Sequence, residues 1–166
     1  MIVRDLAWLV QLGELGHVTV DWRGRRCRGC GRLGCLEAYV SGTSIAERAQ
    51  EAGLSFATSE EVAAAAAAGD AGARALWDET VEALACGLVS IVNLFEPEVV
   101  VLGGGVTRSG DLLLQPVRAS VRAGAMRPAG EAVDVVLSAF GDRVGVAGAA
   151  AIVYDREPLR EVPASG

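Results

Sequence analysis

One histidine and three cysteines occur at intervals that suit the ligands of a single metal ion. They follow the pattern H-x9-C-x2-C-x4-C over residues 17–35, at His17, Cys27, Cys30 and Cys35. Zn²⁺ prefers four nitrogen and sulfur ligands in a tetrahedral arrangement, and a site with three cysteines and one histidine leaves no position for a reacting water. The spacing therefore predicts a structural zinc site in a loop over residues 17–35.

Two other interpretations of these cysteines stay open at this point. All three could be reduced, or two of them could form a disulfide beside a free thiol. The odd number of cysteines in the loop, the neighbouring histidine and the absence of a secretory signal in the sequence favour the metal site. The fourth cysteine, Cys86, falls in a helical stretch, and we expect it to be a small buried apolar residue rather than a fifth ligand.

The composition predicts one compact domain. The chain has 166 residues, of which 51% are hydrophobic, and this length suffices to bury a sizeable core. A formal net charge of −6, with the charged residues scattered, argues against a nucleic-acid-binding face. The alanine run over residues 63–68 is too short to span a bilayer. We therefore expect a soluble, cytoplasmic protein without membrane contacts.

The segments on either side of the predicted metal loop have different patterns. Residues 17–21 alternate with high β propensity, which predicts a strand that enters the loop. Residues 36–53 are typical of two helical pieces broken at Ser41-Gly42, and Ser44 is the expected cap of the second piece.

A long helix is the most regular element that the sequence predicts. A short helix over residues 59–69 precedes it, and Asp70 caps the long helix, which continues to about Phe95. Apolar residues recur along it at helical spacing, so one face should lie in the core. These residues are Leu76, Trp77, Val81, Leu84, Leu88, Ile91, Val92 and Phe95.

Strands and helices alternate in the rest of the chain, which predicts an α/β class. A strand over residues 98–102 is followed by three glycines and by a helix over residues 111–123, and a second strand over residues 133–137 precedes a small-residue helix over residues 144–154. A strand, a glycine loop and a helix in this order bring backbone N–H groups up to an anionic or nucleotide ligand in many α/β proteins. The glycines match neither the dinucleotide fingerprint nor the phosphate-loop pattern, so a plain turn is the alternative.

Three sequence motifs resemble those of the ROK family of bacterial sugar kinases and repressors. They are E-L-G-H from Glu14, C-G-R-L-G-C-L-E from Cys30 to Glu37, and V-L-G-G-G-V from Val101. The resemblance covers residues 13–154, so that residues 1–12 are a non-matching segment and residues 155–166 a tail. It implies the C-terminal α/β domain of an actin-like ATPase (ribonuclease H-like) sugar kinase fold with a zinc-binding loop. The implied activity is that of a glucokinase-like enzyme, which phosphorylates a hexose such as glucose at the 6-hydroxyl.

The resemblance also implies roles for particular residues. Glu14 and Glu37 would accept hydrogen bonds from sugar hydroxyls, and His17 would bind zinc through one ring nitrogen and reach the sugar with the other. The structural zinc ligands would be His17, Cys27, Cys30 and Cys35, although the family usually has one residue fewer between the first two cysteines. The loop that approaches the nucleotide would be Gly103, Gly104 and Gly105. The family further implies ATP and Mg²⁺ as cofactors of a complete member, a hexose or amino-hexose as substrate, and assembly into a homodimer.

Two parts of the family's kinase machinery have no counterpart in the sequence. The family has a D-x-G-G-T phosphate loop and a catalytic aspartate upstream of E-x-G-H, and neither motif is present here. We therefore expect a truncated or frame-shifted reading frame, or one half of a split protein, with no catalytic aspartate of its own and little or no activity alone. The alternatives are a fragment of a sugar-sensing ROK transcriptional regulator and a non-catalytic sugar-binding module.

Overall fold

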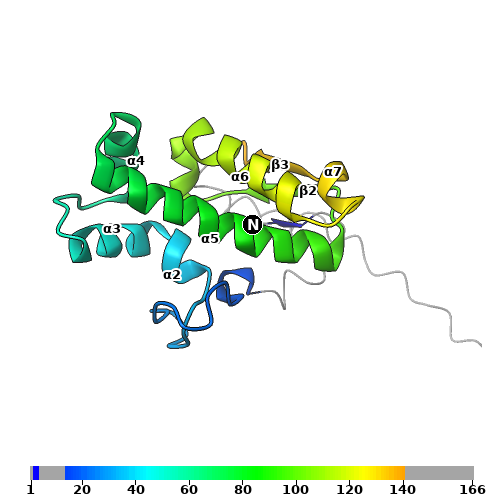
Figure 1. The fold of residues 1–166 in the computed structure, drawn as a ribbon, viewed down its shortest axis with the longest axis horizontal. Helices are drawn as coiled ribbons and strands as arrows, with labels where there is room; N and C mark the ends of the chain where they lie inside the picture. Colours follow the sequence, from blue (N-terminus) through cyan, green and yellow to red (C-terminus); the bar gives the residue numbers. More distant parts are fainter. Residues whose placement is uncertain (1, 4–13, 141–166) are drawn as a thin grey trace, which may run out of the picture.

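A long helix runs through the middle of the fold, and the other elements lie along it (Figure 1). The structure is a computed structural model that describes residues 2–3 and 14–140. Helix α5 (Ala71–Phe95) begins where the sequence predicts, because the side chain of Asp70 accepts a hydrogen bond of 2.8 Å from a backbone N–H of the first turn. It ends at Glu96, which takes the left-handed conformation with φ 43°.

The apolar face of α5 is buried over most of its length, as predicted. Phe95 is the exception at 39% exposed, so its predicted place in the core is wrong. Cys86 is also exposed, which contradicts the prediction of a buried cysteine. It lies two residues, or about 200° of helical turn, from both Leu84 and Leu88 and therefore faces away from them. No described helix, α5 included, is long and apolar enough to cross a membrane.

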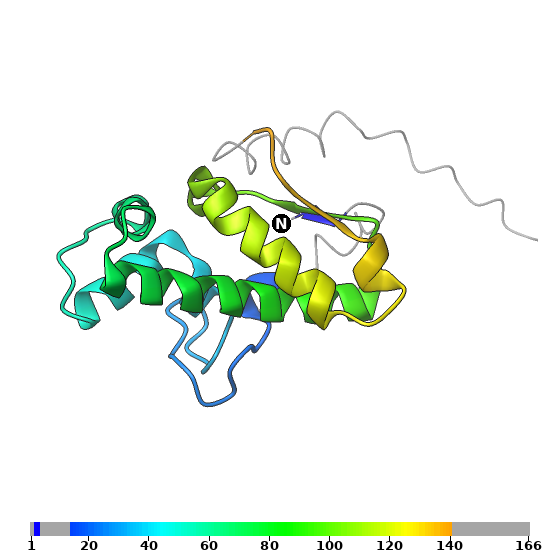
Figure 2. The same ribbon diagram turned by 45° about the horizontal axis from the view of Figure 1, so that its top comes forward.

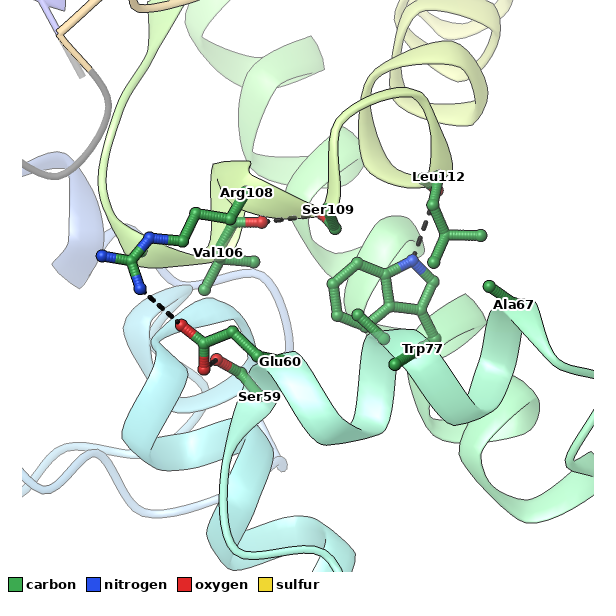
Figure 3. A pocket seen from close by; sticks show the side chains of 11 residues that line it. Ser59, Glu60, Ala67, Trp77, Val106, Arg108, Ser109 and Leu112 are labelled. Carbon is green, nitrogen blue, oxygen red and sulfur yellow. Dashed lines mark hydrogen bonds and ion pairs between the residues drawn. The ribbon is translucent and has the colours of Figure 1, made fainter.

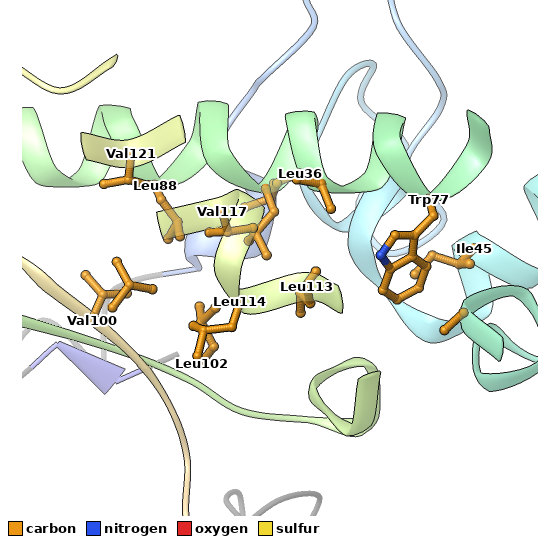
Figure 4. Close-up of a cluster of buried hydrophobic side chains, with 14 of the residues drawn as sticks. Leu36, Ile45, Trp77, Leu88, Val100, Leu102, Leu113, Leu114, Val117 and Val121 are labelled. Carbon is orange, nitrogen blue, oxygen red and sulfur yellow. The ribbon is translucent and has the colours of Figure 1, made fainter. Parts of the chain in front are cut away.

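A sheet of three strands lies beside the helices. Its central strand β2 (Val99–Leu102) pairs antiparallel with β1 (Ile2–Val3) and parallel with β3 (Asp134–Leu137). Both strands predicted in this half of the chain are therefore confirmed, and with them the α/β class. Helix α6 (Asp111–Gly124), also as predicted, lies between α5 and the strands in Figure 2. Apolar side chains of α5, α6 and β2 form one cluster, which Figure 4 shows with Leu88, Val100, Leu102, Leu113, Val117 and Val121.

Three shorter helices connect the predicted metal loop to α5. Helices α2 (Glu37–Val40) and α3 (Gly42–Glu51) meet at Ser41, and α4 (Ser59–Ala67) packs against α5. The predicted break between α2 and α3 is confirmed. The predicted cap is wrong, because the hydroxyl of Ser41 accepts a hydrogen bond of 3.1 Å from the N–H of Ser44. Ser44 therefore lies inside the first turn, and Ser41 supplies the cap.

A buried arginine joins α2, α3 and α5. Arg48 on α3 is 5% exposed, and its guanidinium donates a hydrogen bond of 2.7 Å to the carbonyl of Tyr39 on α2. It also donates to the hydroxyl of Thr80 at 2.9 Å and forms an ion pair with Glu79, both on α5. A buried charge needs such partners to offset the loss of its hydration. Arg48 thus fixes α2, the helix that follows the loop, against the core.

Two predicted elements are not found in the described structure, for different reasons. The strand predicted over residues 17–21 is wrong, because residues Leu15–His17 form a short 3₁₀ helix, η1, and Thr19 makes only an isolated bridge with Cys35. The helix predicted over residues 144–154 lies outside the described residues. The remaining short elements are η2 (Gly105–Ser109) and α7 (Ala129–Ala132).

Candidate metal and sugar site

The chain between η1 and α2 folds back on itself as a loop with two arms. Isolated bridges join the arms, one of them between Thr19 and Cys35. Gly34 has φ +71°, and a Cβ added there would lie 1.5 Å from the carbonyl oxygen of Asp21. Only glycine combines this backbone conformation with such a close approach. The closure of the loop therefore depends on Gly34.

The loop brings the four predicted metal ligands together. The ligand atoms of His17, Cys27, Cys30 and Cys35 all lie within 4.8 Å of one another. The Sγ atoms of Cys30 and Cys35 are 3.5 Å apart, and Cys27 Sγ is 3.6 Å from His17 Nδ1. Tetrahedral zinc, with bonds of about 2.3 Å to sulfur and about 2.0 Å to nitrogen, separates its ligand atoms by about 3.5–3.8 Å. Two separations match this range and all lie within 4.8 Å, so the four side chains, Cys27 included despite the extra residue before Cys30, are compatible with a Zn²⁺ ion.

The protonation of the thiols bears on metal binding, because cysteine binds zinc as the thiolate. Hydrogen bonds from the backbone N–H and the side chain of Arg32 lower the pKa of Cys30 to about 6. These hydrogen bonds therefore favour the thiolate of this exposed cysteine. Burial raises the pKa of Cys35 to about 11, and the neighbouring Cys30 and Cys27 act in the same direction. A bound cation would reverse that shift, since a coordinating thiol is deprotonated.

The two predicted sugar-contacting carboxylates have different relations to the cluster. Glu37 is the first residue of α2, and its Oε2 lies 3.4 Å from His17 Nδ1 and 3.8 Å from Cys27 Sγ. Glu14 is exposed and directly precedes η1, where its carbonyl accepts a hydrogen bond of 2.9 Å from the N–H of His17. The structure thus links Glu37 to the cluster through its side chain and Glu14 through the backbone.

Gly29 and Tyr39 also shape the site, although the ligand spacing does not point to them. A Cβ added at Gly29 would lie 3.1 Å from both Glu37 Oε2 and His17 Cε1, so the absence of a side chain leaves room for this pair. A glycine between two predicted ligand cysteines is a weak sequence signal for such a contact. Tyr39 contacts the loop through its hydroxyl, and no periodic pattern in the sequence indicates that contact.

The predicted glycine loop borders a cavity. Gly104 has φ +110°, and η2 begins at Gly105. Gly105 is one of the residues around a cavity of about 260 Å³ between α4, η2 and the start of α6. The alanines of α4 and Trp77 form apolar walls, and an ion pair of 3.3 Å joins Glu60 and Arg108 on one side (Figure 3). The sequence did not indicate that α4 faces the glycine loop.

Comparisons with known proteins find relatives in one family. The model of the ROK family matches residues 11–156. A glucokinase of Thermotoga maritima is 34% identical over 157 aligned residues, with 86% of this chain and 49% of that protein covered. A solved ROK family glucokinase from Streptomyces griseus, in complex with glucose and AMPPNP, has 30% sequence identity and a TM-score of 0.70, with 84% of this chain and 50% of that chain covered.

A regulator is also among the similar structures. A solved ROK family transcriptional regulator, a homologue of the E. coli MLC protein, has 29% sequence identity and a TM-score of 0.65, with 76% of this chain and 34% of that chain covered. This chain spans about half the length of the glucokinases that it matches. Because the family model covers most of its residues, the chain belongs to the ROK family.

Proposed function

We propose that this chain is the part of a ROK sugar kinase that contacts both the sugar and the nucleotide. The complete enzyme would transfer a phosphoryl group from ATP to a hexose, such as glucose, at the 6-hydroxyl. The observation that carries the proposal is the position of Glu37 beside His17 at the edge of the cysteine cluster. The names of the relatives support the substrate class, since several are glucokinases and one was solved with glucose and AMPPNP.

Carboxylates would orient the sugar. An ionised carboxylate accepts strong hydrogen bonds from hydroxyl groups through both of its oxygens, which suits the adjacent hydroxyls of a hexose. His17 would bind the metal through Nδ1, the nitrogen 3.6 Å from Cys27 Sγ, and leave Nε2 for a sugar hydroxyl. Glu37 would then keep its acceptor oxygens for the sugar. Glu14, which directly precedes η1, would add a second carboxylate.

Zinc would have a structural role in this site. When bound, Zn²⁺ would supply a fixed tetrahedral centre, and its closed set of ligands would exclude activation of a water. Cys27, Cys30 and Cys35 would bind as thiolates and so fix the loop that carries His17. We assign no described residue to proton removal or to positioning of the phosphates. The chain alone should therefore bind ligands with little or no turnover.

The glycine loop would approach the nucleotide. Gly103, Gly104 and Gly105 have no side chains that would keep a ligand away from the backbone N–H groups. The cavity beside Gly105 has apolar walls and a few polar groups, which is the usual composition of a site for a small molecule or cofactor. We propose that the base of ATP enters this cavity and that Mg²⁺ accompanies the phosphates in the complete enzyme.

A sugar-sensing ROK regulator is the second candidate, because the chain is also similar to a ROK transcriptional regulator. It would use the same zinc and sugar residues, and a non-catalytic sugar-binding module would do so too. The net charge of −6 argues that contacts with DNA would not come from this chain. Saturable binding of ATP would favour the kinase, since neither alternative needs a nucleotide. A homodimer stays a prediction.

Calorimetric titration of glucose into the zinc-loaded chain tests the sugar site. We expect saturable binding that Glu37→Gln weakens at least about tenfold, because a hydrogen bond to a charged group contributes about 1.5–3 kcal/mol. Glu82→Gln is the matched control, since Glu82 is an exposed carboxylate on α5. It should leave the affinity unchanged. Absence of binding by the wild type, or equal affinity of the Glu37 variant, would contradict the proposal.

A further inference from the structure

The hydroxyl of Tyr39 lies at the centre of a second set of contacts in the metal loop. Tyr39 belongs to α2 and is 6% exposed. Its hydroxyl donates a hydrogen bond to Asp21 Oδ2 and accepts one from the N–H of Arg25, both at 3.1 Å. Gly24 passes so close that a Cβ added there would lie 2.0 Å from the phenol oxygen. Residues 21–25 therefore fold around this one oxygen atom.

The side chain of Arg25 attaches the same segment to a second helix. Its guanidinium forms paired hydrogen bonds of 2.5 Å and 2.9 Å with the carboxylate of Glu51 on α3. This two-point arrangement is the most direction-specific contact between arginine and a carboxylate. Asp21 closes the turn through its other oxygen, which accepts the N–H of Arg23 at 3.1 Å. The segment is thus held by α2 and α3 together.

These contacts and the cysteine cluster act on different parts of the loop. The ligand cluster joins positions 17, 27, 30 and 35, and the Tyr39 side chain is buried together with Cys27 and Cys35. The Tyr39 hydroxyl, in contrast, joins residues 21–25 to α2. Glu37 lies two residues before Tyr39 on the same short helix, and His17 lies on the loop. Contacts that hold the loop against α2 therefore determine how far apart these two side chains lie. The distance from His17 Nδ1 to Glu37 Oε2 is 3.4 Å.

We infer that Tyr39 is a positioning residue whose hydroxyl fixes the loop on α2 independently of the metal and so keeps Glu37 opposite His17 for the sugar. This inference rests on the proposed function, in which Glu37 binds the sugar. The hydroxyl contacts neither of the two side chains directly and acts through the backbone of the loop and of α2. Tyr39→Phe isolates this role, because it keeps the buried ring and removes both hydrogen bonds.

Hydrogen exchange tests the contact itself. In Tyr39→Phe the N–H of Arg25 loses its acceptor, so its exchange should be about three- to tenfold faster, the range that one net hydrogen bond supports. We expect this increase both in zinc-loaded protein and after chelation, and the zinc content should stay at the wild-type value because no ligand is changed. Unchanged exchange at Arg25 would overturn the inference.

Glucose titration tests the effect on the sugar. The Kd of Tyr39→Phe should rise about three- to tenfold. If Tyr39 acts through Glu37, Glu37→Gln should weaken binding less in the Tyr39→Phe background than in the wild type. Thr58→Ala is the control, since it removes a hydroxyl that caps α4 and accepts the N–H of Glu61 at 3.2 Å. It should lower the melting temperature and leave the Kd unchanged.

The outcomes separate this inference from the function on which it rests. A wild-type chain that binds no glucose contradicts the proposed sugar site and the positioning role together. If the wild type binds glucose, then an unchanged Kd for Tyr39→Phe, or fully additive losses in the double variant, overturns the positioning role alone. A purely structural role predicts such additive losses.

Discussion

The core around α5 and the metal loop over residues 17–35 are stabilised by different interactions. The core consists of apolar side chains such as Leu88 and Val117, both 0% exposed. The loop has isolated bridges, single hydrogen bonds and a small buried cluster that includes Cys27 and Cys35. Burial of apolar surface stabilises the core without a ligand, whereas the loop depends on individual polar contacts and, in our proposal, on zinc. Damage to the loop should therefore leave the core largely intact.

Truncation in the core should have the largest effect on stability. Leu88→Ala leaves a cavity at a fully buried position of α5, so the free energy of unfolding should fall by about 2–5 kcal/mol. Cys86→Ala on the exposed side of the same helix is the control and should change it by less than about 0.5 kcal/mol. Denaturant unfolding followed by circular dichroism measures both. Equal effects of the two variants would contradict the assignment of the buried face.

A change at Gly34 should damage the loop and spare the core. Gly34→Ala puts a Cβ 1.5 Å from the Asp21 carbonyl, so the arms cannot close, and zinc affinity should fall at least about tenfold. Gly31→Ala is a matched control, because Gly31 also has a positive φ of +75° but an added Cβ would meet nothing within 4 Å. It should cost only about 1 kcal/mol of local strain. Zinc competition with a chromophoric chelator compares the two variants, and equal affinities would count against the proposed closure.

Filling the cavity beside the glycine loop should remove nucleotide binding without affecting the sugar. Ala64 lines that cavity, and Ala64→Phe should lower the affinity for ATP at least about tenfold, a loss of about 1.4 kcal/mol, by occupying the space of the base. Ala68→Phe, at the exposed end of α4, is the control. Titration of each variant with ATP and with glucose measures both sites. Undiminished ATP binding by the Ala64 variant would exclude the cavity as the base site.

The ion pair between Arg25 and Glu51 should contribute least to the free energy of unfolding. Its contribution should also depend on pH. The Arg25 guanidinium lowers the pKa of Glu51 in the folded chain below its ordinary value of 4.5. The pKa of Glu51 is lower in the folded chain than in the unfolded chain. The ion pair therefore contributes fully to the free energy of unfolding above pH 4.5, and this contribution is lost as the pH falls through the folded pKa. Glu51 is exposed and Arg25 is only partly buried, so the contribution of the pair should be below about 1 kcal/mol.

Unfolding of the wild type and of Glu51→Gln at pH 7 and pH 3 measures that contribution. The wild type should be slightly more stable than Glu51→Gln at pH 7, and the difference should shrink at pH 3, which lies below the ordinary pKa of 4.5. A difference of the same size at both pH values would show that the charge of Glu51 contributes nothing.

The same contrast between core and loop explains what the sequence could predict. The limits of α5, the cap at Asp70 and both strands of the second half follow from periodicity and from local capping chemistry, and the structure has them. The meeting of His17 with the three cysteines follows from ligand spacing, and the structure brings them together. The helix limits, the cap and the strands depend on residues close together in the sequence, whereas the ligands span residues 17–35 and are predicted from their chemistry.

One error lies where a contact across the fold overrides a local preference, and another lies in a choice between two neighbouring caps. Residues 17–21 have β propensity, but the loop must turn back toward Cys35, so a single bridge replaces the strand. Ser41 and Ser44 are both plausible caps of α3, and in the structure the Ser41 hydroxyl accepts the N–H of Ser44. The partners of the Tyr39 hydroxyl lie 14 and 18 residues away, so no local pattern reveals them.

Glucose titration combined with elemental analysis tests most directly whether zinc organises a sugar site. We expect one zinc per chain, saturable glucose binding in the zinc-loaded protein, loss of that binding after chelation, and its return when zinc is added back, while the α5 core stays folded throughout. Purified protein that contains no zinc and binds glucose with the same affinity before and after chelation would contradict this expectation.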